Sequence, residues 1–323
     1  PPLDAARQRA LGPEAWVATV HLTYALRGFD SAPRQFVASY TVSRTPAGWG
    51  FVDDSDGTTQ PQPWDLSPMT VLSSPTTLVI GSAPRARLQD YLALGDAAHT
   101  TIAGVWGSAR PGVIIAPATS KELVTSLQRR DASGLDQVAA ITDGPREEPG
   151  AATSDRVFIN PDTFLRLNAE GRRVVVTHEL THVTVRASTT RPVPLWLSEG
   201  FADYVGFSGL GLDPRTVAAD LLTKVRAGTG PTGLPTDRAF DPTLGVIAPV
   251  YNAAWLAVSR ISQRYGQNRL VAFYRAVALD APADLSVSMD PSAVAWRAFP
   301  AVLGVSEDDF TAGWLAELGS LAG

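Results

Sequence analysis

Residues 172–187 contain the feature that most constrains what this chain can form. His178 is followed directly by Glu179 and, four positions on, by His182, within a run whose apolar residues have the spacing of a buried helix. On a helix, positions i and i+4 lie on one face about a turn apart, roughly 6 Å along the axis. Two imidazoles so placed can bind one ion, and zinc takes nitrogen ligands readily. The segment predicts a zinc-binding helix.

Glu179 lies next to the predicted metal rather than on it. A carboxylate there can take a proton from a zinc-bound water, whose pKa the metal lowers to about 7. The alternative is a helix whose histidines form hydrogen bonds within a core. That alternative is disfavoured because two of the four histidines in the chain fall in a motif that chance produces in roughly one of a thousand such chains. Glu179 is therefore predicted to be the general base.

A catalytic zinc site needs a third protein ligand and leaves a fourth position for water. Residues 194–204 predict a second helix, with Pro194 near its first turn. Glu199 on this helix follows His182 at a distance that suits a short loop and a returning helix, and it is predicted to be the third ligand rather than a solvated carboxylate. Asp203, one turn further on, can accept a hydrogen bond from the non-ligating nitrogen of a zinc histidine.

Composition narrows the class of protein. At 323 residues the chain is long enough for one large domain or two ordinary ones. A net charge of −5 provides no basic surface, so nucleic acid is not expected as a partner. No apolar run reaches the roughly 18 residues that a membrane span requires. Without cysteine, the chain forms neither thiolate zinc sites nor disulfides.

The first part of the chain predicts an antiparallel sheet. Apolar and polar residues alternate over 16–26 and again over 36–42, which is typical of strands with one solvated face. A turn then leads to a third strand at 50–52. Residues 60–77, rich in Pro, Ser and Thr, predict a loop. We expect residues 1–83 to form a small sheet-rich domain of unknown role.

After Pro84 the pattern predicts mixed and then helical structure. Helical spacing follows Pro84, a capping box at residues 119–122 opens another helix, and helices continue from Asn160 to the end. Three short apolar runs predict strands at 113–116, 138–141 and 157–159. Residues 84–323 are thus predicted to form a second domain, and the fold class is α+β.

The two helices carry a family resemblance. HELTH at 178–182 followed by WLSEGFADYV at 196–205 resembles the gluzincin zinc metallopeptidases, which include thermolysin and the aminopeptidase N family. The motif WLxEGxA in the second of these segments is most similar to that of minimal bacterial proteins of the peptidase MA superfamily. The resemblance covers residues from Pro84 onward. It implies a short mixed sheet, the HExxH helix, a glutamate helix and a helical C-terminal part, with zinc as cofactor, a peptide or protein as substrate, and Asp203 in contact with a zinc ligand.

The resemblance also implies a role for Tyr251. Aminopeptidase-like gluzincins have a tyrosine at the start of a later helix, and its hydroxyl donates to the oxyanion of the tetrahedral intermediate. Tyr251 occupies a comparable place, at the start of a helix expected to end near Tyr265. The alternative is an aromatic core residue of that helix.

The chain departs from the aminopeptidase N pattern in one respect. That family has a Gly-x-Met-Glu-Asn element whose glutamate binds the substrate's amino group, and no such element occurs here. Glu147 and Glu148 lie at a comparable distance before His178, but in a segment that predicts a solvated loop. An endopeptidase is therefore favoured over an aminopeptidase. Residues 138–141 are the candidate edge strand for pairing with an extended peptide.

Four arginines flank the metal helix, and their role is open. They could bind acidic substrate groups or be plain helix-surface charges; they are Arg172, Arg173, Arg186 and Arg191. Two other functions also remain open. One is a non-catalytic interaction module on a zinc-peptidase scaffold, and the other is a metal-dependent hydrolase of a non-peptide bond.

The chain begins with Pro1 rather than methionine, and we expect a signal peptide or membrane anchor upstream of it. An extracytoplasmic location, secreted or surface-anchored, is the corresponding expectation.

Overall fold

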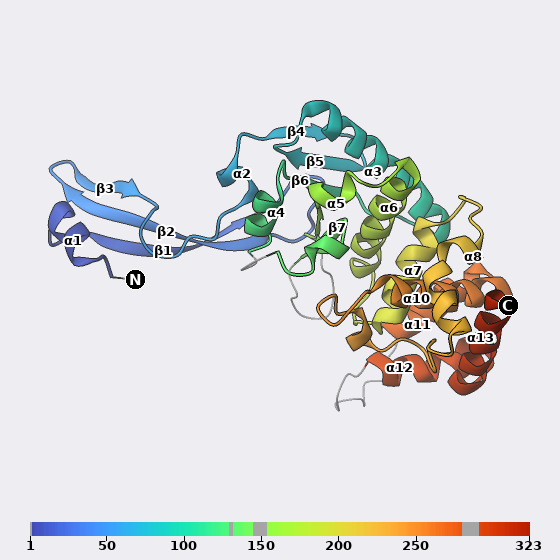
Figure 1. The fold of residues 1–323 in the computed structure, drawn as a ribbon. Helices are drawn as coiled ribbons and strands as arrows, with labels where there is room; N and C mark the ends of the chain where they lie inside the picture. Colours follow the sequence, from blue (N-terminus) through green and yellow to red (C-terminus); the bar gives the residue numbers. More distant parts are fainter. Residues whose placement is uncertain (1, 129–131, 145–153, 280–290) are drawn as a thin grey trace.

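The alternating N-terminal segments form a three-stranded antiparallel sheet in the computed structural model, which describes residues 2–128, 132–144, 154–279 and 291–323. Strand β1 (Trp16–Tyr24) pairs with β2 (Arg34–Thr45), which pairs with β3 (Gly48–Asp53). The short helix α1 (Ala5–Leu11) lies at the far end of the sheet. Together they form an arm, residues 2–60, that extends away from the rest of the molecule (Figure 1).

At its far end the arm differs from the predicted pattern of one buried and one solvated face. The apolar face exposes Trp16, Trp49 and Phe51 by 51%, 54% and 65%. The polar face is instead covered there, because Ser43 donates a hydrogen bond to the Leu11 carbonyl and the Ser39 hydroxyl donates one to the Thr58 carbonyl. The alternation of apolar and polar residues correctly located the three strands. Which face of the sheet is buried, however, depends on the segments that pack against it.

A mixed five-stranded sheet forms the centre of the molecule, with the order β4-β5-β6-β8-β7. Its strands are β4 (Thr70–Ser73), β5 (Thr77–Gly81), β6 (Gly112–Ala116), β7 (Ala140–Asp143) and β8 (Arg156–Ile159). Strands β5, β6 and β8 are parallel, and the edge strands β4 and β7 are antiparallel to their neighbours. The prediction of a loop over 60–77 is wrong, because α2 (Pro63–Leu66) and β4 lie there.

The predicted division at residue 83 would cut this sheet between β5 and β6, which pair along their length. A boundary before β4 keeps all five strands together. The division of the chain into two domains itself stays a prediction.

Helices cover both faces of the central sheet. Helices α3 (Arg85–Trp106) and α6 (Ala169–Arg186) pack on one face, and α4 (Ser120–Ser126) packs on the other. The Thr119 side chain caps α4 as predicted by accepting from the Glu122 N–H. Glu122 does not complete the predicted capping box, since its carboxylate accepts from the Ala118 N–H and the Ser82 hydroxyl.

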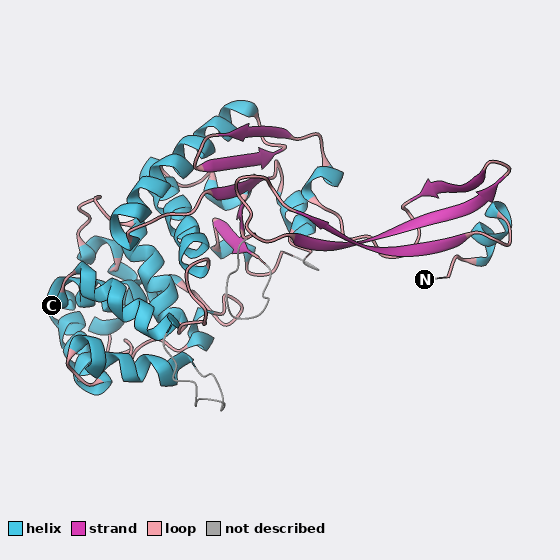
Figure 2. Cartoon of the chain, turned by 180° about the vertical axis from the view of Figure 1, so that it is seen from behind, coloured by secondary structure: helices cyan, strands magenta, loops and turns pink. Residues whose placement is uncertain are grey.

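Most of the remaining helices gather at the end of the molecule opposite the arm, while α5 (Pro161–Phe164) and the turn η1 (Leu135–Gln137) lie beside the central sheet (Figure 1 and Figure 2). Helix α7 (Leu195–Gly206) packs between α6 and α10 (Ala248–Tyr265). The others are α8 (Pro214–Val217), α9 (Ala219–Arg226), α11 (Gln267–Leu279), α12 (Pro291–Ala298) and α13 (Glu307–Ala322), with single turns η2 (Asp237–Phe240) and η3 (Phe299–Leu303). Within the described ranges, no helix has both the length and the apolar character needed to span a bilayer.

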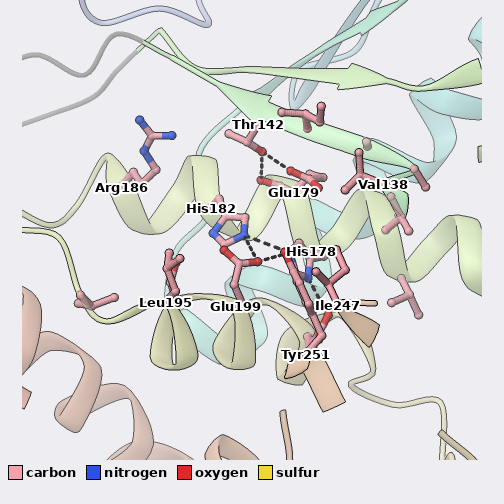
Figure 3. A pocket seen from close by; sticks show the side chains of 18 of the residues that line it. Val138, Thr142, His178, Glu179, His182, Arg186, Leu195, Glu199, Ile247 and Tyr251 are labelled. Carbon is pink, nitrogen blue, oxygen red and sulfur yellow. Dashed lines mark hydrogen bonds and ion pairs between the residues drawn. The ribbon is translucent and has the colours of Figure 1, made fainter. Parts of the chain in front are cut away.

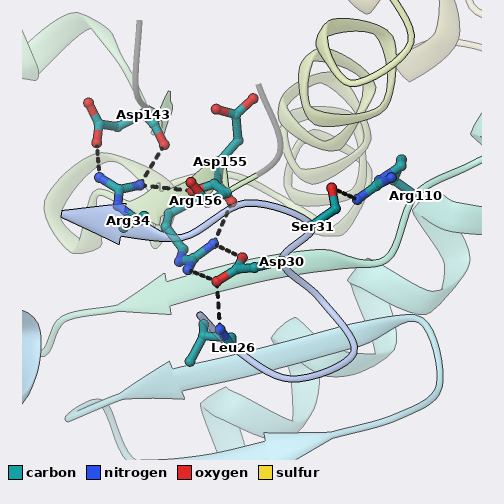
Figure 4. A network of polar contacts seen from close by, with 9 residues as sticks. Leu26, Asp30, Ser31, Arg34, Arg110, Asp143, Asp155 and Arg156 are labelled. Carbon is teal, nitrogen blue, oxygen red and sulfur yellow. Dashed lines mark hydrogen bonds and ion pairs between the residues drawn. The ribbon is translucent and has the colours of Figure 1, made fainter. Parts of the chain in front are cut away.

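Ion pairs attach the base of the arm to the central sheet (Figure 4). Arg156 of β8 forms two 2.6 Å hydrogen bonds with the carboxylate of Asp30, and these side chains are only 3% and 1% exposed. Arg34 of β2 is paired with Asp143 of β7 at 2.7 Å. The arm is therefore fixed to the two strands next to the histidine helix.

Candidate metal centre

Local sequence explains why two helices meet at the site. Helix α6 begins after Asn168, whose side chain accepts a hydrogen bond from the Gly171 N–H. Its apolar side faces the central sheet, where Leu180 fills the space beside Gly112. Its opposite side carries the two histidines. Helix α7 begins directly after Pro194, as predicted, and places Glu199 toward α6.

The three predicted ligands converge on one point (Figure 3). Nε2 of His178 lies 3.1 Å from Nε2 of His182 and 3.1 Å from Oε2 of Glu199. Nε2 of His182 lies 3.4 Å from the same carboxylate oxygen. Within the described part of the chain, His178, His182 and Glu199 form the one group of histidines and carboxylates whose ligand atoms lie close enough together to bind the same metal ion.

The spacing of these atoms fits zinc. Zinc–nitrogen and zinc–oxygen bonds of about 2.0–2.1 Å in a tetrahedron place neighbouring ligand atoms about 3.3 Å apart. The three distances of 3.1, 3.1 and 3.4 Å match this edge length. Two imidazoles and one carboxylate are also a ligand set that catalytic zinc uses. The residues present therefore fit a zinc ion.

Asp203 fixes the orientation of one imidazole. Its Oδ1 lies 2.7 Å from Nδ1 of His178, so the proton of that ring is held on Nδ1 and Nε2 is left as the ligand atom. Burial raises the pKa of Asp203, although the nearby His178 opposes that shift. Burial would also raise the pKa of Glu199, but the two histidines outweigh it and hold that pKa well below its usual range. Glu199 is accordingly ionised.

Glu179 lies on the side of the ligand cluster that faces strand β7 (Figure 3). Its Oε2 accepts a 2.6 Å hydrogen bond from the hydroxyl of Thr142. Sequence reasoning missed Thr142, because it lies just beyond the predicted strand at 138–141 and nothing in its local pattern marks it. This contact holds the carboxylate beside the histidines.

Tyr251 lies across the cluster from Glu179, in the first turn of α10. Its ring packs against Phe240 at 5.2 Å between centroids, and the centroid of His178 is 6.3 Å away. Burial raises the pKa of Tyr251 strongly, and the negative charge of Glu199 adds to the effect. The hydroxyl therefore stays protonated, and it is a hydrogen-bond donor that lies next to Glu199.

The three predicted ligands line one cavity of about 970 Å³, together with Glu179, Thr142, Asp203 and Tyr251. Residues 137–142 form one wall, so the predicted edge strand lies at the cavity, although β7 itself spans Ala140–Asp143. Glu147 and Glu148 lie outside the described residues. The structure thus brings together every residue that the sequence marked for the metal site, from three helices and the sheet edge.

Comparisons with known proteins add a distant likeness. No family model and no curated protein matches the chain. Among solved structures, it is similar to an M1 zinc metallopeptidase from Deinococcus radiodurans, solved as a mutant bound to a Tyr-Ser-Ala substrate, with 13% identity and a TM-score of 0.40. The match covers 94% of this chain and 61% of that one, so the chain spans less than two thirds of that protein's length. At this level of similarity, a function for this chain has to be argued from its own residues.

Proposed function

We propose that this chain is a zinc-dependent peptidase of the gluzincin type. The observation that supports the proposal most is the triangle of ligand atoms from His178, His182 and Glu199, with edges that fit one zinc ion. Glu179 beside this triangle supplies the base that hydrolysis requires.

The roles of the residues follow from their positions. His178, His182 and Glu199 would hold the ion, which supplies Lewis acidity and lowers the pKa of a coordinated water to about 7. Glu179 accepts the proton of the attacking water and passes it to the leaving amine. Tyr251 donates a hydrogen bond to the oxyanion that forms on the substrate carbonyl.

The sheet edge supports a peptide as the substrate. Strand β7 is the last strand of its sheet, so its outer edge carries backbone groups that an extended chain can pair with. The same residues line the cavity beside the metal ligands. A peptide paired there would lie across the base. Beyond the metal site, no described residue of the cavity wall is a carboxylate able to bind a terminal amine, which favours an endopeptidase.

Tyr251→Phe tests the oxyanion role. We expect kcat for peptide cleavage to fall by about 10²- to 10³-fold while the zinc content is unchanged, because the variant loses only the donating hydroxyl. Steady-state kinetics and metal analysis check this. Tyr265→Phe, at the other end of α10, is the matched control and should keep the wild-type rate. Unchanged kcat in Tyr251→Phe would leave Tyr251 as a packing residue.

The proposed function is tested by metal removal and substrate screening. We expect about one zinc per chain, and cleavage of pooled peptides that stops after chelation and returns with added zinc. Pooled esters provide the comparison. A zinc-loaded protein that cleaves esters but no peptide would indicate a non-peptide hydrolase. One that cleaves neither would indicate an interaction module on a peptidase scaffold.

A further inference from the structure

The structure separates the four arginines that flank the metal helix into two pairs. Arg172 and Arg173 donate hydrogen bonds to the backbone carbonyls of Leu165 and Ser208, and neither lines the cavity. Arg186 and Arg191 both line it. Only the second pair is placed to contact a substrate.

Arg186 continues the face of α6 that carries the ligands. It follows His182 by four residues, so it lies one turn further along the same side of the helix, roughly 6 Å along the axis (Figure 3). Its Nε lies 3.5 Å from Oδ2 of Asp155, a carboxylate that is 1% exposed. Asp155 thus contacts the Nε side of the Arg186 guanidinium. The terminal nitrogens have no hydrogen-bond partner among the residues that the structure describes.

Arg191 adds a second cation to the same cavity from the loop between α6 and α7. Its side chain is half-buried, and within the described ranges it has neither a hydrogen bond nor an ion pair. The acidic residues on the described part of the wall are Glu179, Glu199 and Asp203, which are all engaged at the metal site. Arg191 therefore offers a positive charge without a counterion among the described residues, and Arg186 offers its terminal nitrogens beside it.

We infer that Arg186 and Arg191 form a subsite for a substrate carboxylate, a conclusion that rests on the proposed peptidase function. A guanidinium binds a carboxylate through paired N–H groups, which gives both charge and geometry. An extended peptide advances about 3.3 Å per residue, so one helical turn beyond His182 corresponds to about two residues. The carboxylate therefore lies within about two residues of the scissile bond. It is either the C-terminus or an Asp or Glu side chain.

Four matched sets of acetylated pentapeptide pools identify the source. They end in a carboxylate or an amide, and carry Glu or Gln at one interior position. The readouts are kcat/KM with the zinc-loaded protein, and the Kd of fluorescein-labelled peptides for Glu179→Gln. We expect one carboxylate-bearing form to be preferred about 10- to 100-fold over its amide counterpart. Preference for the acid terminus identifies the C-terminus, and preference for Glu identifies a side chain.

The variants assign this preference to the two arginines. Arg191→Gln and Arg186→Gln should each remove most of the preference, measured as the ratio of kcat/KM for the carboxylate-bearing pool to that for its amide counterpart. Arg191→Gln breaks no hydrogen bond or ion pair with the described residues, so it tests the subsite with little disturbance of the fold. Arg264→Gln, an exposed arginine at the end of α10, is the control for the loss of one charge.

The outcomes separate the subsite from the peptidase function. Equal kcat/KM and equal Kd for acid and amide pools would overturn the subsite and leave the peptidase intact. A preference that persists in both arginine variants would also overturn it. If no pool is cleaved but Glu179→Gln binds acids preferentially through the arginines, the subsite stands and the peptidase function fails.

Discussion

Glu179→Gln is expected to lower kcat for peptide cleavage by about 10²- to 10⁴-fold while the protein keeps its zinc. The amide is nearly the same size as the carboxylate and can still accept the hydrogen bond from Thr142, but it cannot take a proton from water. The three ligands are untouched. Activity measurements combined with metal analysis of the same sample therefore distinguish loss of the base from loss of the metal.

Glu170→Gln is the matched control for this substitution. Glu170 lies in the first turn of the same helix and is exposed. The Glu170→Gln protein should therefore cleave peptides at the wild-type rate. If Glu179→Gln keeps full activity with zinc bound, another group accepts the proton, and the assigned mechanism is wrong.

Gly200→Ala is expected to disturb the helix packing that positions Glu199. A Cβ at this position would lie 2.4 Å from the carbonyl oxygen of Ala254 and 2.8 Å from a methyl of Val258. Because the first contact is backbone, α7 must move away from α10, and Glu199 moves with it. We expect a loss of about 1–3 kcal/mol in the free energy of unfolding. We also expect roughly a 10²-fold fall in kcat, since a displacement near 1 Å can have that effect.

Denaturant unfolding and kinetics check this prediction, and Gly104→Ala is its control. Gly104 lies near the end of α3, and a Cβ there would have no neighbour within 4 Å. That change should be neutral or stabilise the helix by up to about 1 kcal/mol. Equal stability and rate in Gly200→Ala and the wild type would show that α7 and α10 tolerate a wider separation.

The candidate metal site was predictable because most of its signal is local. The spacing of His178 and His182 fixes a shared helix face, and Pro194 marks the start of the helix that carries Glu199. Asp203 follows from the same periodicity. The shared helix faces need only local patterns, whereas the meeting of Glu199 with the histidines also needs the two helices to pack together.

The features that the sequence left open depend on contacts between distant segments. Thr142 meets Glu179 only because β7 lies at the sheet edge next to α6. The need for glycine at position 200 arises where two helices touch, which no local pattern reveals. Strand β4 lies in a segment whose composition predicts a loop, and its pairing with β5 overrides that preference.

The buried pair at the base of the arm determines how the chain can be shortened. A truncation that removes the arm also removes Asp30, and it leaves Arg156, which is 3% exposed in the intact chain, without its carboxylate partner. An unpaired buried cation of this kind costs about 3–5 kcal/mol, and Arg156 belongs to the strand next to β7. Lost activity in a truncated protein would thus report a damaged sheet before any role of the arm. Replacing Arg156 by leucine in the same truncation removes that charge and makes the deletion interpretable.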